Sequence, residues 1–223
     1  LLHESTGAKI TFLIHASQNK PTQQVGVVAR DSNEKIVKII EFPDSTEVDL
    51  SKYEVNVGVY AFDVDWLRSV ISDLEPRSKG EYNLTDLIEF ASNRDERIEC
   101  YETLDPSESL SVNTKKDLSE VESATQDRLR SFALESGAVL LDKASVYFDV
   151  TASVAADVII HPNTQIRGVT VIDTGAVIGP NTRINDSIIG SDAIIEDSVL
   201  DSATLGNNVH VGPFSNSRPG TVL

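Results

Sequence analysis

The sequence predicts an α/β domain followed by a parallel β-helix of hexapeptide repeats, and three observations support this fold class. In residues 1–113, short β-rich runs alternate with segments of helical spacing. Residues 114–137 have the pattern of one long helix. In residues 138–223, an aliphatic residue recurs about every six positions, a period that fits neither a 3.6-residue helix nor a two-sided strand.

The first region has the elements of a sheet domain. Helical spacing predicts helices over residues 63–74 and 84–91. Runs rich in β-branched and aromatic residues predict strands over 9–15, 25–30, 35–42, 53–63 and 97–101. Alternation within residues 53–63 places Val55, Val57 and Val59 on one face. Strands mixed with helices at this spacing indicate an α/β sheet domain.

The long helix is predicted to join the two domains. Thr114 and Asp117 have the spacing of a capping box, which marks a helix N-terminus. The helix is expected to end near Gly137, just before the repeats. One stripe along it, with the charged residues largely outside, consists of Leu118, Val121, Thr125, Leu129 and Phe132.

The C-terminal repeat predicts a triangular coil whose aliphatic residues point inward. Gly and Asn, which tolerate the positive φ of tight corners, follow many of the aliphatic positions. Ordinary strands of a β-sandwich are the alternative, but they rarely give so regular a spacing. The repeating residues are Val154, Ile160, Ile166, Ile172, Ile178, Ile184, Ile189, Ile195, Leu200, Leu205 and Val211.

The composition excludes several classes of function. The 223 residues include 19 basic and 35 acidic side chains, a net charge of −16. Nucleic-acid backbones are bound by an excess of Lys and Arg, so a nucleic-acid partner is not expected. No apolar run is long enough for a membrane span, and no signal segment is visible. The single cysteine, Cys100, suits a reducing cytoplasm, where we expect the protein to act.

Four segments in this order resemble the bacterial bifunctional N-acetylglucosamine-1-phosphate uridyltransferase / glucosamine-1-phosphate N-acetyltransferase family. They are Glu54–Gly58, Gly80–Asp86, Ser111–Thr114, and Val211–Phe214 with Arg218–Thr221. By this resemblance, residues 1–113 are the C-terminal part of a nucleotidyltransferase domain and 114–137 a linker helix. Residues 138–223 then begin a left-handed β-helix acetyltransferase domain, which implies a homotrimer.

The resemblance implies a sugar-binding role for four residues of the first domain. Gly26 matches a glycine that lets a ligand approach closely, and Glu41 matches a carboxylate that accepts hydrogen bonds from sugar hydroxyls. Asn56 supplies an amide that both donates and accepts, and it is a rare residue in a strand, which independently favours a site or a bulge. Thr85 lies in the segment that lines the sugar pocket.

Two further residues and the cofactors follow from the same resemblance. Asn113 matches a ligand of the catalytic Mg²⁺, and Arg218 matches an arginine that binds sugar phosphate in the acetyltransferase site. The implied small-molecule substrates are UTP, N-acetylglucosamine 1-phosphate, glucosamine 1-phosphate and acetyl-CoA. The implied product, UDP-N-acetylglucosamine, feeds peptidoglycan and lipopolysaccharide precursors. None of the four histidines is assigned to catalysis.

The sequence also departs from the family pattern. Residues 24–27 replace a Gly-Tyr-Gly-Arg-like run, and Val57 replaces a threonine. The chain has no methionine and no glycine-rich phosphate loop with a catalytic lysine. It is therefore expected to be an internal segment, truncated at both ends and inactive by itself. The alternatives are a glucose-1-phosphate nucleotidylyltransferase with a hexapeptide tail, or a non-catalytic assembly or regulatory subunit.

Overall fold

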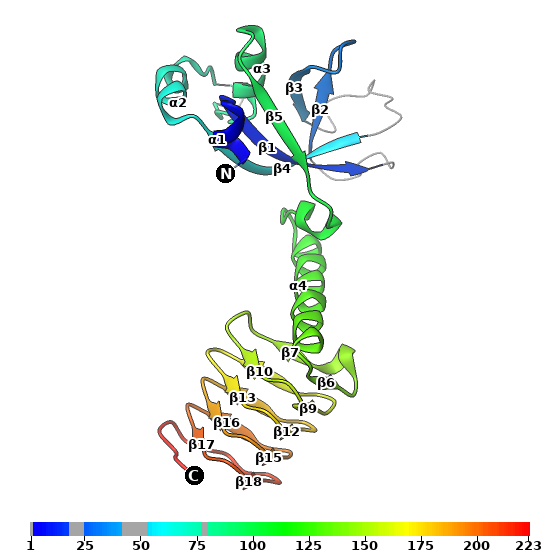
Figure 1. Ribbon diagram of the computed structural model, residues 1–223, viewed down its shortest axis with the longest axis vertical. Coiled ribbons are helices and arrows are strands. Elements are labelled where there is room, and N and C mark those ends of the chain that lie inside the picture. Colours follow the sequence, from blue (N-terminus) through cyan, green and yellow to red (C-terminus); the bar gives the residue numbers. More distant parts are fainter. Residues whose placement is uncertain (1, 18–24, 42–52, 77–79) are drawn as a thin grey trace. The chain divides into compact units, whose positions relative to one another are not determined.

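The computed structural model describes residues 2–17, 25–41, 53–76 and 80–223 (Figure 1). Contacts between residues divide the chain into two compact units, Leu1–Asn113 and Thr114–Leu223, called unit 1 and unit 2 below. No helix among the described residues is both long enough and apolar enough to cross a membrane. Two residues of the sequence analysis lie outside the described residues. They are Phe42, the last residue of a predicted strand, and Gln24, the first residue of the run that departs from the family pattern.

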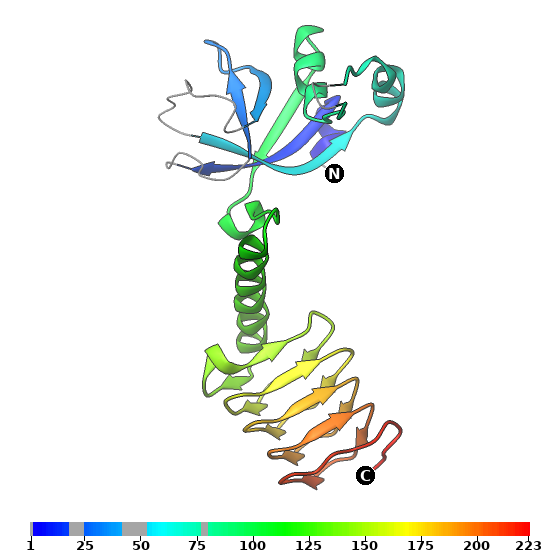
Figure 2. The ribbon, with the colours of Figure 1, turned by 180° about the vertical axis from the view of Figure 1, so that it is seen from behind.

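Unit 1 contains a mixed sheet in the order β3-β2-β4-β1-β5 (Figure 2). Neighbouring strands are antiparallel, except that β1 and β5 run parallel. The strands are β1 Ile10–Ser17, β2 Gly26–Arg30, β3 Ile36–Glu41, β4 Tyr53–Phe62 and β5 Ile98–Glu102. The five predicted strands are therefore confirmed, with ends shifted by one or two residues.

Helices supply the other part of the apolar core of unit 1. They are α1 Leu2–Thr6, α2 Val64–Val70 and α3 Asp86–Asn93, with short 3-10 turns at Ile71–Asp73 and Pro106–Ser109. The predicted helices at 63–74 and 84–91 are confirmed as α2 with its 3-10 turn and as α3. The core consists of Ile10, Phe12, Ile14, Val28, Ile36, Ile39, Trp66, Val70, Leu87, Ile88 and Ala91.

Strand β4 corrects the prediction of a single alternating face. Between the pairs Phe12↔Tyr60 and Ile14↔Asn56, β4 has three residues where β1 has one, so β4 bulges. Gly58 has a φ of 83° there, and its N–H donates to Asn56 Oδ1 at 3.1 Å. Val55 is buried whereas Val59 is 55% exposed. Val55 and Val59 therefore differ in burial, because the bulge between them interrupts the regular alternation and pairing of β4.

Unit 2 begins with α4, Lys115–Glu135. Its N-terminus has the predicted capping box, in which the Thr114 side chain accepts from Asp117 N–H and Asp117 accepts from Thr114 N–H. The predicted stripe is not the buried face, since Leu118 and Phe132 are more than half exposed. The buried residues of α4 are instead Gln126, Arg130 and Ala133.

The buried polar residues of α4 bind the backbone of the first coil. Gln126 Nε2 donates to Phe148 O at 2.8 Å, and Phe148 N–H donates back to Gln126 Oε1 at 3.0 Å. Arg130 Nε donates to Val146 O at 2.8 Å. An amide side chain thus pairs with the edge of the coil much as another strand would. This docking is not visible in the sequence, where Gln126 and Arg130 have the pattern of solvent-facing residues.

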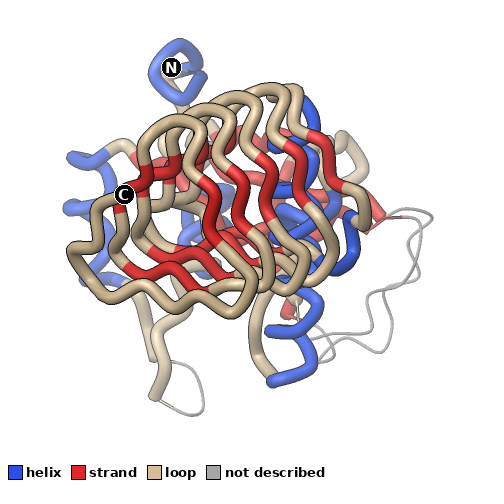
Figure 3. The backbone as a smooth tube through the Cα atoms, turned by 90° about the horizontal axis from the view of Figure 1, so that it is seen from below, coloured by secondary structure: helices blue, strands red, loops and turns tan. Residues whose placement is uncertain are grey.

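The repeats form a parallel β-helix with three sheets, as predicted (Figure 3). The sheet orders are β16-β13-β10-β7, β17-β14-β11-β8 and β18-β15-β12-β9-β6. The strands are β6 Val139–Leu140, β7 Tyr147–Phe148, β8 Ser153–Val154, β9 Ile159–Ile160, β10 Gln165–Arg167, β11 Val171–Ile172, β12 Val177–Ile178, β13 Arg183–Asn185, β14 Ile188–Ile189, β15 Ile194–Ile195, β16 Val199–Asp201, β17 Thr204–Leu205 and β18 His210–Val211.

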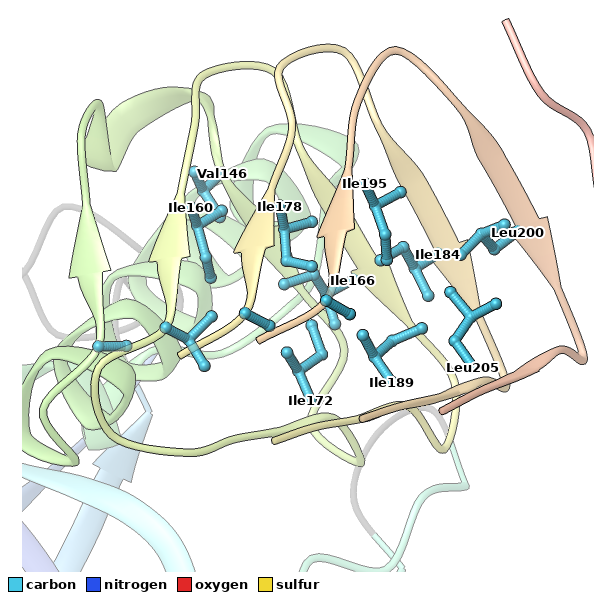
Figure 4. Close-up of a cluster of buried hydrophobic side chains, with 14 of the residues drawn as sticks. Val146, Ile160, Ile166, Ile172, Ile178, Ile184, Ile189, Ile195, Leu200 and Leu205 are labelled. Atoms are coloured by element: carbon cyan, nitrogen blue, oxygen red, sulfur yellow. The ribbon is translucent and has the colours of Figure 1, made fainter. Parts of the chain in front are cut away.

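The repeated aliphatic residues form the core of unit 2, which confirms the prediction (Figure 4). From Ile160 to Leu205 they are at most 1% exposed, and residues in register stack from coil to coil. The corners are stabilised by amide ladders: Asn163 Nδ2 donates to Asn181 Oδ1 at 3.1 Å, and Asn181 Nδ2 donates to Asp197 Oδ1 at 2.8 Å. All three corner residues have positive φ.

Candidate functional site

The sheet of unit 1 changes from apolar to polar at one end of a single face. Gly26 pairs with Glu41 across β2 and β3, two residues beyond buried Val28 and Ile39 respectively. Residues two apart in a strand share a face, so Gly26 and Glu41 continue the face of the apolar core. Asn56 of β4 joins them there, because it pairs with the core residue Ile14.

Thr85 completes this group from the helix that covers the face. It occupies the N-cap position of α3, but its side chain makes no capping hydrogen bond. Its hydroxyl instead donates to Glu41 Oε1 at 3.3 Å. Glu41 is thus held from one side while its remaining lone pairs stay available as acceptors. We call Gly26, Glu41, Asn56 and Thr85 the polar end of the sheet.

Gly26 lies where neighbouring strands pack closely. A Cβ atom on Gly26 would stand 2.6 Å from Ile39 Cγ2 and 3.5 Å from both Cβ and Nδ2 of Asn56. Strand packing therefore explains why this position is a glycine, in addition to the close approach of a ligand that the sequence predicts. It also brings the backbone of β2 against the Asn56 amide.

Tyr60 is a fifth member of this region that the sequence analysis did not single out. It lies on β4 opposite Phe12 and packs against the core, with its ring stacked 5.9 Å from that of Phe12 and 5.7 Å from that of Phe62. Its hydroxyl is buried and has no hydrogen-bond partner. The sequence could have indicated Tyr60, because a tyrosine at a core-facing position of a strand needs a partner for its buried hydroxyl.

Burial raises the pKa of Tyr60 to about 12. The charge on Glu41 raises the pKa of Tyr60 further, whereas the nearby Asn56 side chain lowers it in part. Asn56 nevertheless makes no hydrogen bond of normal geometry with the Tyr60 hydroxyl. The phenol is therefore protonated throughout the neutral range and offers one O–H donor beside the polar end.

The chain is similar to known proteins over almost its whole length. Residues 2–106 match the nucleotidyl transferase family. The chain is 37% identical to the bifunctional protein GlmU of Heliobacterium modesticaldum over 222 residues, which is 99% of the chain and 48% of that relative. It is 36% identical to GlmU of Carboxydothermus hydrogenoformans and 34% identical to GlmU of Bacillus velezensis, over 99% and 97% of the chain and 49% and 47% of the relatives.

The chain is related to the GlmU proteins. The similarity extends through both units, and the chain spans about half the length of the curated relatives it matches. The whole polar end lies within the residues that match the nucleotidyl transferase family, whereas Asn113 and Arg218 lie outside them. The family resemblance inferred from the sequence is thereby confirmed.

The two remaining predicted site residues of this GlmU relative lie away from the polar end in the chain. Asn113 is exposed and is the last residue of unit 1, directly before the helix cap at Thr114. Arg218 belongs to unit 2, where it lines an open groove of the β-helix together with Arg167 and Arg183. The structure thus brings together four of the six predicted residues.

No metal centre is formed by the described residues alone. Among them, no three His, Cys, Asp or Glu side chains converge on a point where an ion could bind. Asn113 offers one amide oxygen, and a magnesium site requires carboxylate or phosphate oxygens as well. Asn113 of this GlmU relative could therefore supply one ligand to Mg²⁺, and the remaining ligands would have to come from other groups.

Proposed function

We propose that unit 1 supplies the sugar-binding side of a uridylyltransferase site of the GlmU type. The observation that carries this proposal is the convergence of Gly26, Glu41, Asn56 and Thr85 at one end of one sheet face. Carboxylate, amide and hydroxyl groups in such an arrangement suit a ligand with many hydroxyls. The similarity to GlmU proteins over 99% of the chain supports the same assignment.

The chemistry proposed is transfer of a uridylyl group from UTP to N-acetylglucosamine 1-phosphate. The sugar phosphate oxygen forms a bond to the α-phosphorus of UTP, and the bond to the departing pyrophosphate breaks. Such a reaction depends chiefly on holding two anions in line. Glu41 accepts hydrogen bonds from sugar hydroxyls, with Thr85 fixing the carboxylate. Asn56 uses Oδ1 for Gly58, which leaves Nδ2 to donate to the sugar.

The wider functions concern the whole protein. Its acetyltransferase reaction would use acetyl-CoA and glucosamine 1-phosphate, with Arg218 binding the phosphate and with trimers formed through the β-helix. Mg²⁺ would neutralise phosphate charge in the uridylyltransferase reaction, with Asn113 as one ligand. No step of the sugar binding described above depends on the metal. We place the enzyme in the cytoplasm, in the synthesis of cell-wall precursors.

Sugar binding by the 223-residue chain tests the proposal directly. Saturation-transfer NMR with N-acetylglucosamine 1-phosphate at millimolar concentration detects weak binding, and glucose 1-phosphate serves as the competing ligand. We expect binding of the N-acetyl sugar and weaker binding of glucose 1-phosphate. Absence of binding would refute the proposed site, and preference for glucose 1-phosphate would favour a glucose-1-phosphate nucleotidylyltransferase.

Two substitutions locate the binding at the polar end. Asn56→Asp keeps an oxygen acceptor for Gly58 N–H but loses the Nδ2 donors, so it removes one contact without removing the bulge. Glu41→Gln removes a charged acceptor. Each should weaken binding about fivefold or more, the effect of one lost hydrogen bond. Glu102→Gln, at the exposed end of β5, is the control and should bind as the unsubstituted chain does.

A further inference from the structure

We infer that the Tyr60 hydroxyl is an additional specificity determinant of the sugar site, donating a hydrogen bond to an oxygen of the bound sugar. The inference rests on the proposed function, and it assigns a residue outside the set indicated by the family resemblance. Three observations support it: the hydroxyl lacks a partner, its polar neighbours are site residues, and its ring is rigidly held.

The missing partner is the first observation. The Tyr60 hydroxyl is buried, yet no hydrogen bond satisfies it. Leaving a buried hydroxyl unpaired is unfavourable, and most such groups in folded proteins have a partner. Phenylalanine would fill the same space without this cost, so the hydroxyl indicates a partner that arrives with the ligand.

The identity of the neighbours is the second observation. Tyr60 and Asn56 lie on the same strand, on either side of the bulge at Gly58, and both pair with core-facing residues of β1. Asn56 and Glu41 are the polar groups that act on the Tyr60 phenol electrostatically. A ligand held by Glu41 and Asn56 would therefore lie on the same sheet face as Tyr60.

The third observation is that the Tyr60 ring is held in place and its phenol is protonated. Phe12 and Phe62 both stack against the Tyr60 ring and hold it in place, so the O–H group changes direction chiefly by rotation about its C–O bond. Because the phenol stays protonated in the neutral range, it donates a hydrogen bond and carries no charge. A neutral donor suits an uncharged sugar oxygen, whereas a cation would suit the phosphate.

Tyr60→Phe separates this role from a structural one. The substitution keeps the ring and removes only the hydroxyl. Because the hydroxyl is unpaired in the free protein, thermal stability should stay unchanged or rise. Affinity for N-acetylglucosamine 1-phosphate, measured by NMR titration, should fall about fivefold to tenfold. Tyr147→Phe, a half-exposed tyrosine of unit 2, is the matched control and should change neither quantity.

The outcomes distinguish the inference from the proposed function. Unchanged affinity in Tyr60→Phe, with binding by the unsubstituted chain, overturns the inference and leaves the proposed function intact. Reduced stability together with reduced affinity also overturns it, since the hydroxyl would then be structural. No binding by the unsubstituted chain overturns both. Deoxy analogues of the sugar phosphate provide a second measurement: the analogue that lacks the acceptor should bind the unsubstituted and Tyr60→Phe chains equally.

Discussion

Two adjacent isoleucines of strand β14 should differ sharply in their contribution to stability. Ile189 is fully buried in the β-helix, stacked between Ile172 and Leu205 of the neighbouring coils. Ile188 is its direct neighbour and is 54% exposed. The pair offers a comparison in which residue type, strand and coil are all the same, and only the direction of the side chain differs.

The magnitude follows from burial. Replacing Ile189 by alanine removes three carbon atoms from the core, which at about 0.8 kcal/mol per methylene amounts to roughly 2.4 kcal/mol of transfer free energy. The cavity left between the coils adds to this, so Ile189→Ala should lower the free energy of unfolding by about 2–5 kcal/mol. Ile188→Ala should lower it by about 0.5 kcal/mol, since both variants lose the same β-branched residue but only one loses a core contact.

The assay is urea unfolding of the 223-residue chain followed by far-ultraviolet circular dichroism, which reports the secondary structure of both units. The single tryptophan, Trp66, lies in unit 1, so its fluorescence follows that unit separately. Equal destabilisation by the two substitutions would refute the inward and outward assignment of β14. So would a loss of less than about 1 kcal/mol in Ile189→Ala.

Three further substitutions test other features. Gly190→Ala should destabilise unit 2 by about 1–3 kcal/mol in urea unfolding, because its Cβ would meet the carbonyl carbon of Gly206 at 2.6 Å, whereas Gly206→Ala, with 3.4 Å to its nearest neighbour, should be tolerated. Gln126→Leu should cost about 1–3 kcal/mol by leaving backbone groups of the first coil unpaired, against little change for exposed Thr125→Ala. The pKa of Asp63 is held below its usual 3.8 by hydrogen bonds from a helix N–H and a lysine. Its stabilising effect is therefore present above pH 3.8 and lost as the pH falls through the lower folded-state pKa, so Asp63→Asn should flatten the acid side of the stability profile measured by tryptophan fluorescence.

The sequence predicts the β-helix well because one local rule repeats. Each coil places aliphatic residues inward at nearly fixed spacing, so the pattern contains every isoleucine and leucine of the core from Ile160 to Leu205, although not the buried alanines Ala176 and Ala193. The strands of unit 1 were also predictable from composition. The bulge in β4 was foreseen only as one reading of Asn56, because a bulge depends on the register between β1 and β4, which is a long-range property.

The polar end of the sheet was predictable only in part. Gly26, Glu41, Asn56 and Thr85 were indicated by resemblance, since residues so far apart in the chain show no common pattern. Their meeting at one place depends on the strand pairing and on α3. Tyr60 was missed because an aromatic residue in a strand has the pattern of core, and only its surroundings reveal an unpaired hydroxyl.

The docking of α4 shows why polarity alone does not predict which face of a helix is buried. Gln126 and Arg130 belong to the buried face because the end of a β-helix exposes backbone N–H and C=O groups rather than an apolar surface. An apolar stripe would leave those groups unsatisfied, at a cost comparable to a lost hydrogen bond for each. A helix that covers such an edge therefore requires side chains that imitate a strand, and an amide that both donates and accepts meets that requirement best.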